Sequence, residues 1–386
     1  MASSDGSGGL NRNQSFDSRY NMKVGPVLMN VTGGMSFSYN DNINLSDTNK
    51  KSDFIITPRV DITNHWPLTS LNSADLNVGL GYSKYLNNSS ADSSFVNVSP
   101  GSNLTFVVYM GDFKFTFTDG FYFQQDPVSE IGLANVTTFG RISNTASANV
   151  DWDLNDVILS LGYSHTNFIA TSAAFDYVDS STDTVTQRTS FTITPTLTAG
   201  LSNSISFTSY DQDFLNNNWT LMSGPFASMQ LSPYVSVSAT TGVQLLNAST
   251  GGQVGDTTGN EISWYGSLSV THRINNYMNQ TLSLSQSNPT GLNSNFVGLT
   301  SLQHSFSWQL IRDVSLGTTE FVEYGSDSGG SLAENVWRYG GSVNLGYNLT
   351  QKLSLSLTYT LTMRESNAVD RNYTQNVLTL GANYAF

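Results

Sequence analysis

The chain ends in the stretch RNYTQNVLTLGANYAF, residues 371–386, in which apolar and polar side chains alternate. Leu378, Leu380, Ala382, Tyr384 and Phe386 share one parity, and small or polar residues occupy the other. The preceding stretch LSLSLTYTLTMR, residues 353–364, alternates in the same way. Successive side chains of a β-strand point to opposite faces. Each stretch therefore predicts a strand with one apolar face and one face lined largely by hydroxyl groups.

The composition indicates what these two faces contact. Only 38% of the 386 residues are hydrophobic and 12% are charged, and Ser, Thr, Asn and Gly are abundant. A soluble chain of this kind would bury only a small core, whereas a barrel in lipid turns its apolar face to hydrocarbon and its polar face to water. No run reaches the roughly 20 apolar residues of a transmembrane helix. We therefore expect an all-β, antiparallel, up-and-down transmembrane barrel.

Alternating segments recur from Val27 to Phe386 and predict about 18 strands, an even number as in bacterial single-chain barrels. Two of them are predicted over residues 185–198 and 203–213, which places Pro58 and Pro195 inside strands, where a proline removes a ladder hydrogen bond. The segment Val314–Tyr324 alternates poorly because Glu320 and Glu323 have opposite parity, and a β-bulge would explain it.

Short and long connections alternate along the chain, as periplasmic turns and extracellular loops do in such barrels. Two connections depart from this order: 64–74 is longer than expected and 214–218 is shorter. The short turns fall at 111–112, 154–156, 199–202, 232–234, 274–277, 312–313 and 349–351. The long ones fall at 41–52, 86–101, 125–137, 168–184, 247–260, 288–297, 325–335 and 365–370.

The domain organisation is simple. We expect a flexible arm over residues 1–20 and a single barrel over residues 21–386. The N-terminus has neither a basic n-region nor an apolar core, so no signal peptide is visible. Because an outer-membrane protein needs one, we interpret the sequence as a mature or recombinant form of a bacterial outer-membrane protein.

Placing the polar parity inside gives a lumen lined by Ser, Thr, Asn, Gln and Gly with few charges. The lumen-lining candidates are Arg59, Asp61, Lys114, Arg141, Asp151, Arg188, Arg273, Arg338 and Arg364; Asp53 shares their parity. The wall then leans basic, while acids such as Asp183, Asp256, Asp327 and Glu334 fall in connections. This pattern predicts a wide conduit for neutral or mildly anionic solutes, although each arginine could equally brace the wall by pairing with an acid.

Residues 1–26 are too few to form a plug domain, so we expect any constriction to come from inward-folded loops. The connections 86–101 and 168–184 are the longest candidates, and both could instead merely cover the outer mouth.

Other function classes find little support. The four histidines are scattered without a recognisable catalytic spacing, so we expect no enzyme, no cofactor and no metal site. Asp151, Asp153, Asn155 and Asp156 resemble part of a calcium loop but lack its glycine and final glutamate, which favours a plain turn. Cysteine is absent, and the net charge of −13 argues against nucleic acid as a partner.

Several short motifs resemble the β-barrel porin 2 family. They are Gly25-Pro26-Val27, the stretch Met35–Ile43, Asp126-Pro127 after an aromatic strand, and the final stretch Leu378–Phe386. The resemblance covers the chain from about residue 21 and implies secretion of an exopolysaccharide across the outer membrane, with outer-membrane lipid, a polysaccharide and a periplasmic export partner as partners. It carries over no catalytic residue.

Three functions therefore stay open. The first is a passive outer-membrane pore for a secreted polysaccharide, and the second is a general or sugar-selective uptake porin. Trimeric assembly and an inward-folded loop would favour uptake, whereas a monomer with a periplasmic partner would favour export. The third is a structural or adhesive barrel with a closed bore.

Overall fold

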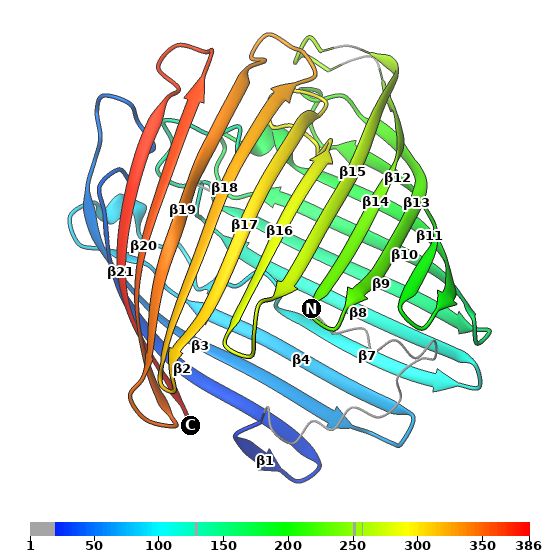
Figure 1. The fold of residues 1–386 in the computed structure, drawn as a ribbon. Helices are drawn as coiled ribbons and strands as arrows, with labels where there is room; N and C mark the ends of the chain where they lie inside the picture. The colour runs from blue at the N-terminus through cyan, green and yellow to red at the C-terminus, as the bar shows by residue number, and fades with distance from the viewer. Residues whose placement is uncertain (1–19, 128–129, 250–251, 257) are drawn as a thin grey trace.

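The computed structural model describes residues 20–386, apart from 128–129, 250–251 and 257, and shows a closed antiparallel barrel (Figure 1). Its 18 long strands are β2 (Val27–Asn40), β3 (Asp53–Pro67), β4 (Asn72–Gly81), β7 (Asn103–Met110), β8 (Phe113–Gln124), β9 (Arg141–Asp153), β10 (Val157–Ala170), β11 (Ser180–Thr194), β12 (Leu197–Tyr210), β13 (Asn218–Ser232), β14 (Val235–Ala248), β15 (Gly259–Arg273), β16 (Met278–Ser287), β17 (Val297–Ile311), β18 (Val314–Asp327), β19 (Asn335–Asn348), β20 (Leu353–Ser366) and β21 (Tyr373–Ala385). The predicted fold class and strand number are confirmed.

Shorter elements complete the chain. β1 (Met22–Val24) forms a small hairpin with the start of β2, while β5 (Lys84–Tyr85) and β6 (Asn97–Val98) pair with the long strands β3, β4 and β8. Two 3₁₀ turns lie at Ser89–Ala91 and Asp176–Val178. No helix of the described residues is long and apolar enough to cross a membrane. Of the predicted N-terminal arm, only Tyr20 belongs to the described residues.

The C-terminal strand closes the barrel. Residues 32–40 of β2 pair with residues 377–385 of β21. Along its other edge β2 pairs with β3, and along its other edge β21 pairs with β20. Every long strand therefore has two neighbours, which satisfies backbone groups that lipid could not. The outward parity of β21 carries Leu378, Leu380, Tyr384 and Phe386, all well exposed, as the alternation predicts.

The predicted turn at 199–202 is wrong. β11 ends at Thr194 and β12 begins at Leu197, so Pro195 and Thr196 form the turn and Pro195 lies outside a strand. Residues 199–201 read like a turn because they include Ala199 and Gly200. Gly200 instead lies in β12, where a side chain would collide with the ring of Phe226, whose Cε1 lies 2.9 Å from the position of an added Cβ.

The two connections that departed from the predicted order, 64–74 and 214–218, follow the alternation of short turns and long connections in the structure. β3 runs on to Pro67, which leaves only residues 68–71 as the turn to β4, and β12 ends at Tyr210, which lengthens the next connection to 211–217. Short turns thus lie at one rim and long connections at the other throughout, with the connection 82–102 carrying β5 and β6.

The predicted bulge in Val314–Tyr324 is also wrong. β18 pairs with β19 without a register shift, and the shift in its pairing with β17 lies beside the turn, between Gln309 and Ile311. Glu320 and Glu323 differ in parity because Glu320 points outward, beside His304, and Glu323 points inward, against Arg338.

Pro58 lies inside β3, as predicted, at a place where its missing amide hydrogen costs nothing. Its carbonyl accepts a hydrogen bond from the Tyr82 amide, so its nitrogen faces the same side. On that side β4 has ended at Gly81 and β5 has yet to begin at Lys84. The ladder is interrupted there, and no donor is required of the proline.

Inward-facing glycines supply a test of the fold. A Cβ added at Gly340 on β19 would lie 2.0 Å from the Leu361 carbonyl oxygen, whereas one at Gly317 on β18 would meet nothing closer than 3.9 Å. We expect Gly340→Val to destabilise the folded barrel by about 1–3 kcal/mol through overpacking. The urea midpoint of the heat-modifiable folded form measures this. Gly317→Val is the matched control, and an equal midpoint shift in both variants would contradict the packing.

Candidate channel and its constriction

The inward face of the wall is lined by hydroxyl and amide groups, many of which bond across strands. Thr145 and Thr166 hydroxyls are 2.9 Å apart, and Thr184 and Ser206 hydroxyls are 3.0 Å apart. Such side chains hold water without fixing a charge, which suits a passage for hydrated solutes.

Two of the predicted cations are neutralised by acids on the wall. Arg59 donates to both oxygens of Asp61 at 2.9 and 2.7 Å on β3. Arg338 on β19 contacts Glu323 on β18 at 2.6 Å, with both side chains largely covered. These pairs face inward but present little net charge to a solute.

The structure brings Lys114, Asp151 and Arg188 into one transverse row. Lys114 on β8 lies opposite Asp151 on β9, which lies opposite Ser160 on β10, which in turn lies opposite Arg188 on β11. Asp151 accepts hydrogen bonds from the Ser160 hydroxyl at 2.6 Å and the Asn149 amide at 2.9 Å. The row therefore places one cation on either side of an acid.

Arg188 is held flat against the wall by an aromatic ring. Its guanidinium carbon lies 3.3 Å from the centroid of the Phe226 ring, a cation–π arrangement. Phe226 in turn lies over Gly200, which leaves room for the ring. Arg273 is separate from this row, at the end of β15 beside the short turn 274–277, and is exposed at the rim of the short turns.

Arg141 and Arg364, by contrast, do not line an open passage, since they are 3% and 1% exposed. Arg141 donates to the carbonyls of Asp126 and Phe139, at 2.8 and 3.2 Å, and lies 3.5 Å from Glu130. All three belong to the connection between β8 and β9, residues 125–140. Arg141 therefore anchors that connection at its own root.

Arg364 anchors the same connection from a distant part of the wall. It donates to the Ile131 carbonyl at 3.1 Å and to Glu334 at 2.5 Å. Glu334, 5% exposed, also accepts from Arg371 at 2.9 Å, and Arg371 donates to the Gly132 carbonyl at 2.5 Å. One buried carboxylate thus joins two arginines, and both arginines hold the connection 125–140. We call Glu334, Arg364 and Arg371 the glutamate clamp.

The connection 125–140 reaches across the long-loop mouth. It leaves the wall at β8, yet its partners Arg364 and Arg371 lie on and next to β20, six strands away round the barrel. The amide of Asn135 also bonds to the Leu45 carbonyl of the connection 41–52. The connection therefore narrows the mouth rather than capping its own hairpin.

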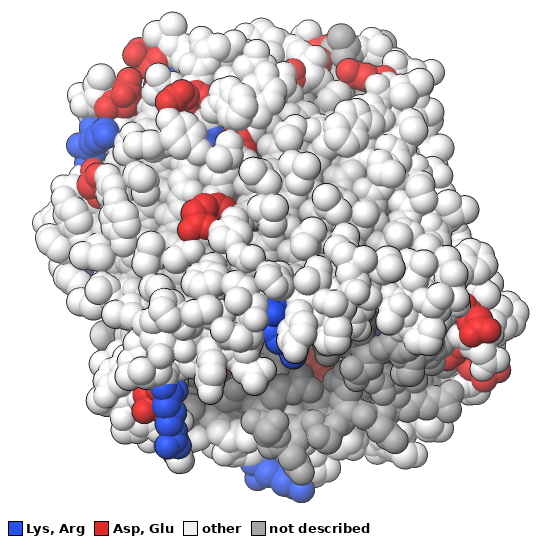
Figure 2. All heavy atoms as spheres, viewed as in Figure 1, with Lys and Arg blue, Asp and Glu red and all other residues white. Residues whose placement is uncertain are grey.

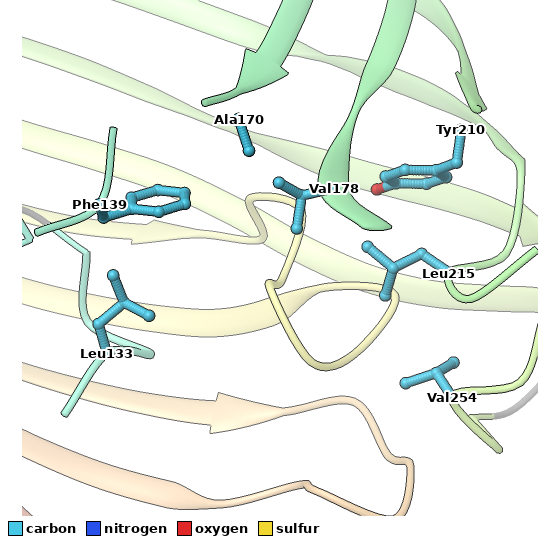
Figure 3. Packing of buried hydrophobic residues seen from close by; sticks show 7 residues of the cluster. All are labelled: Leu133, Phe139, Ala170, Val178, Tyr210, Leu215 and Val254. Carbon is cyan, nitrogen blue, oxygen red and sulfur yellow. The ribbon is translucent and has the colours of Figure 1, made fainter. Parts of the chain in front are cut away.

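Apolar side chains of this connection and of several others pack against one another (Figure 3). The buried members are Leu133, Phe139, Ala170, Val178, Tyr210, Leu215 and Val254, which we call the mouth core. Val178 lies centrally in Figure 3, between Phe139 on one side and Tyr210 and Leu215 on the other. These residues come from strand ends and loops between β8 and β15, so the loops of that side form one packed body.

Burial in the mouth core alters the ionisation of its neighbours. It raises the pKa of the Tyr177 phenol, which stays protonated at neutral pH. Burial also raises the pKa of the Asp179 carboxyl, with Asp176 and Asp211 nearby adding to the rise. The Ala170 amide donates to that carboxylate at 2.7 Å and works in the opposite direction.

The two connections expected to constrict the bore behave differently. Residues 86–101 belong to the wall, because β5 and β6 extend the sheet and buried Asp53 accepts from the amides of Asn87 and Asn88, at 3.0 and 2.7 Å. The connection 168–184 is shorter than expected, since β10 ends at Ala170 and β11 begins at Ser180. It contributes Val178, Tyr177 and Phe175 to the mouth core.

The expected basic bias of the wall is not observed. Asp75, Glu261, Glu323 and Asp327 also lie on the inward parity, and they join Asp53, Asp61 and Asp151. Asp327 belongs to β18 rather than to a connection, and Asp183 lies on β11 with its side chain outward. The inward wall thus carries acids and bases in similar number.

Sequence reasoning missed the glutamate clamp. Glu334 reads as one of many solvated loop acids and Arg371 as the first residue of the closing strand. The only signal was Asp126-Pro127 after an aromatic strand, which marks the start of the crossing connection but not where it ends.

Comparison with known proteins identifies solved structures with the same fold. The chain matches no family model and no curated protein. Among solved structures, OpdK from Pseudomonas aeruginosa is 9% identical with a TM-score of 0.54, and the alignment covers 93% of this chain and 99% of that one. A BenF-like porin from Pseudomonas fluorescens is 10% identical with a TM-score of 0.53, and the alignment covers 94% and 100%. The chain has the fold of outer-membrane porins.

OpdK has also been solved with vanillate, and that structure is 9% identical with a TM-score of 0.53 over 93% of this chain and 99% of that one. At such identity the likeness concerns the fold alone. The predicted membership of the β-barrel porin 2 family is not shown by these comparisons.

The glutamate clamp yields a prediction about the mouth. Glu334→Gln leaves buried Arg364 and half-buried Arg371 without their carboxylate, and breaking a buried ion pair in this way typically costs about 3–5 kcal/mol. We expect the connection 125–140 to loosen and single-channel conductance to rise. Glu365→Gln, an exposed residue of β20 that bonds Tyr339, is the control and should conduct as the unmodified chain does. Unchanged conductance in Glu334→Gln would contradict the role of the clamp.

The transverse row yields a second prediction. Replacing Lys114 and Arg188 by glutamine removes both cations beside Asp151, so the reversal potential under a salt gradient should shift toward cation selectivity. The control is Lys352→Gln in the short turn after β19, outside the bore. A shift of the same size in the control would mean that the row does not govern ion passage.

Proposed function

We propose that this chain is a bacterial outer-membrane channel through which small hydrated solutes enter the cell by passive diffusion. The observation that carries the proposal is the connection 125–140, which the glutamate clamp holds across the mouth and which contributes Leu133 and Phe139 to the mouth core. Such a constriction admits small molecules and excludes long ones. The hydroxyl-rich wall provides a wet path without strong binding, as passage requires.

Small organic anions are the solute class that the interior supports best. Lys114 and Arg188 flank Asp151 on the wall, and the Phe226 ring beneath Arg188 offers an apolar face beside a cation. Carboxylates form charge-assisted hydrogen bonds with such groups. The vanillate found with OpdK is a molecule of this kind, which agrees with the proposal without supplying it.

Secretion of a polysaccharide, which the sequence resemblance implies, fits the mouth less well. A polymer would have to displace the buried carboxylate of Glu334 and the apolar contacts of the mouth core along its whole passage. A structural barrel with a closed bore stays the remaining alternative, and it differs from a channel by passing no solute.

Liposome swelling with the refolded full chain tests the proposal. We expect fast entry of a monosaccharide and of a small aromatic carboxylate, and slow entry of a heptasaccharide. Equal entry of the heptasaccharide would favour a polymer conduit, and absence of swelling with every solute would favour a closed structural barrel. The Glu334→Gln variant should narrow the difference between small and large solutes.

A further inference from the structure

A hollow of about 310 Å³ lies on the outer wall near the rim of the long connections, over β11–β14, the strands on the right of Figure 1. Its lining includes Asp183, Phe207, Trp219 and Asn247, which lie directly opposite one another in turn on these four strands. They share the outward parity of Val185, a well exposed residue of β11. The hollow therefore faces the lipid rather than the bore.

One carboxylate with an unused oxygen lies in this hollow. Asp183 accepts a hydrogen bond from the Tyr163 hydroxyl at 2.7 Å and lies 2.8 Å from Nδ1 of His165, and both contacts are made by its Oδ1. Among the described residues no group donates to its Oδ2, and the side chain is 48% exposed. A carboxylate offers about four acceptor sites, so this oxygen can bind a donor from a ligand.

Two aromatic side chains extend the same row. Phe207 lies opposite Asp183 across the sheet, and Trp219 lies opposite Phe207. The face of an aromatic ring attracts a cation, and tryptophan does so most strongly. The lining residues, all in the described part of the chain, include no lysine or arginine. The hollow thus combines a carboxylate and two rings that favour a positive charge, and it has no fixed positive charge to favour an anion.

The outward rows on the two sides of the hollow differ in polarity. Toward the rim, Ser181 on β11 lies opposite Ser209 on β12. Toward the centre of the membrane the next row is wholly apolar and consists of Val185, Ile205, Leu221 and Leu245. The hollow therefore lies at the boundary between hydrocarbon and the polar headgroups, where the aromatic girdles of such barrels are found.

We propose that this hollow binds the primary ammonium group of an amphiphile whose hydrocarbon chain lies along the apolar row. The ammonium donates a charge-assisted hydrogen bond to Oδ2 of Asp183, and the rings of Phe207 and Trp219 contact its positive charge. Because the long connections of such barrels are extracellular, the amphiphile belongs to the outer leaflet. The proposal concerns the outer wall and does not depend on what passes through the bore.

A similar pair of side chains elsewhere on the outer wall supplies a matched control. His304 on β17 lies 2.8 Å from Glu320 on β18. The residues directly opposite Glu320 are His304 and Gly341, so no phenyl or indole ring lies beside that carboxylate across the sheet. Figure 2 shows this face as almost uncharged, with an isolated acidic patch at mid-height over these strands. Glu320 thus provides an outward carboxylate without the aromatic neighbours of Asp183.

Photolabelling of the folded full chain in neutral detergent micelles tests the proposal. The probe is dodecylamine with a photoreactive diazirine on its chain, and peptide mapping by mass spectrometry locates the label. We expect the label on the segments of β12 and β13 that carry Ile205 and Leu221. Dodecanol with the same diazirine has no charge and should label the outer wall without this preference.

Asp183→Asn keeps the shape of the side chain and removes its charge, so labelling of Ile205 and Leu221 by the amine should fall about tenfold. Glu320→Gln should be labelled as the unmodified chain is, and heat modifiability verifies that each variant is folded. Undiminished labelling in Asp183→Asn, an equal fall in Glu320→Gln, or the same pattern of labelling from dodecanol would overturn the proposal.

A second variant tests the aromatic contribution and leaves the bonds of Asp183 to Tyr163 and His165 intact. Trp219→Leu keeps an apolar side chain and removes the indole, so amine labelling should fall roughly two- to fivefold. Labelling by dodecanol should not change. An equal change for the amine and the alcohol would mean that the hollow does not recognise the ammonium charge, which overturns the proposal.

Discussion

The structure depends on one constraint: inside a bilayer, every backbone amide and carbonyl must find its partner within the protein. A sheet of this length satisfies it only by closing, and here the closing contact joins β2 to β21. Two-residue periodicity follows from closure, since each strand then has one face toward lipid and one toward the lumen. Even Pro58 obeys the constraint, because it lies where the ladder is already interrupted.

The connections at the long-loop rim determine how far the bore is constricted. A barrel of 18 strands is wide enough to leave an aqueous channel, so passage is decided by what enters the bore. In this chain one connection crosses the mouth, the arginines Arg364 and Arg371 hold it, and the buried Glu334 joins those arginines. The wall itself is nearly neutral in balance, and its charges are local pairs and one transverse row rather than a general basic lining. The proposed selection by size at the mouth therefore has a structural basis in the crossing connection, whereas the nearly balanced wall charges do not favour one sign of solute.

The sequence alone predicts the barrel because the two-residue periodicity repeats in every strand. An error in the position of one hairpin therefore leaves the other strands correctly predicted. The hairpin at Pro195 was misplaced by a few residues because Ala199 and Gly200 imitate a turn, while the reason for Gly200 lies on another strand, in Phe226. The candidate site was harder. Parity correctly indicates which side chains point inward, but not whether a loop covers them, so Arg141 and Arg364 counted as lining residues although both are buried. Arg141 bonds carbonyls of the connection that precedes it, whereas Arg364 bonds the Ile131 carbonyl and Glu334 far away in the chain, and the alternation of side chains encodes neither set of contacts.

The central claim is that the connection 125–140 narrows the channel at the long-loop mouth. Polymer exclusion in a planar bilayer measures this directly, with polyethylene glycols of increasing size added to one side at a time and the conductance of oriented channels recorded. We predict that larger polymers enter from the side of the short turns than from the side of the loops. The same size limit from both sides would contradict the constriction at the mouth.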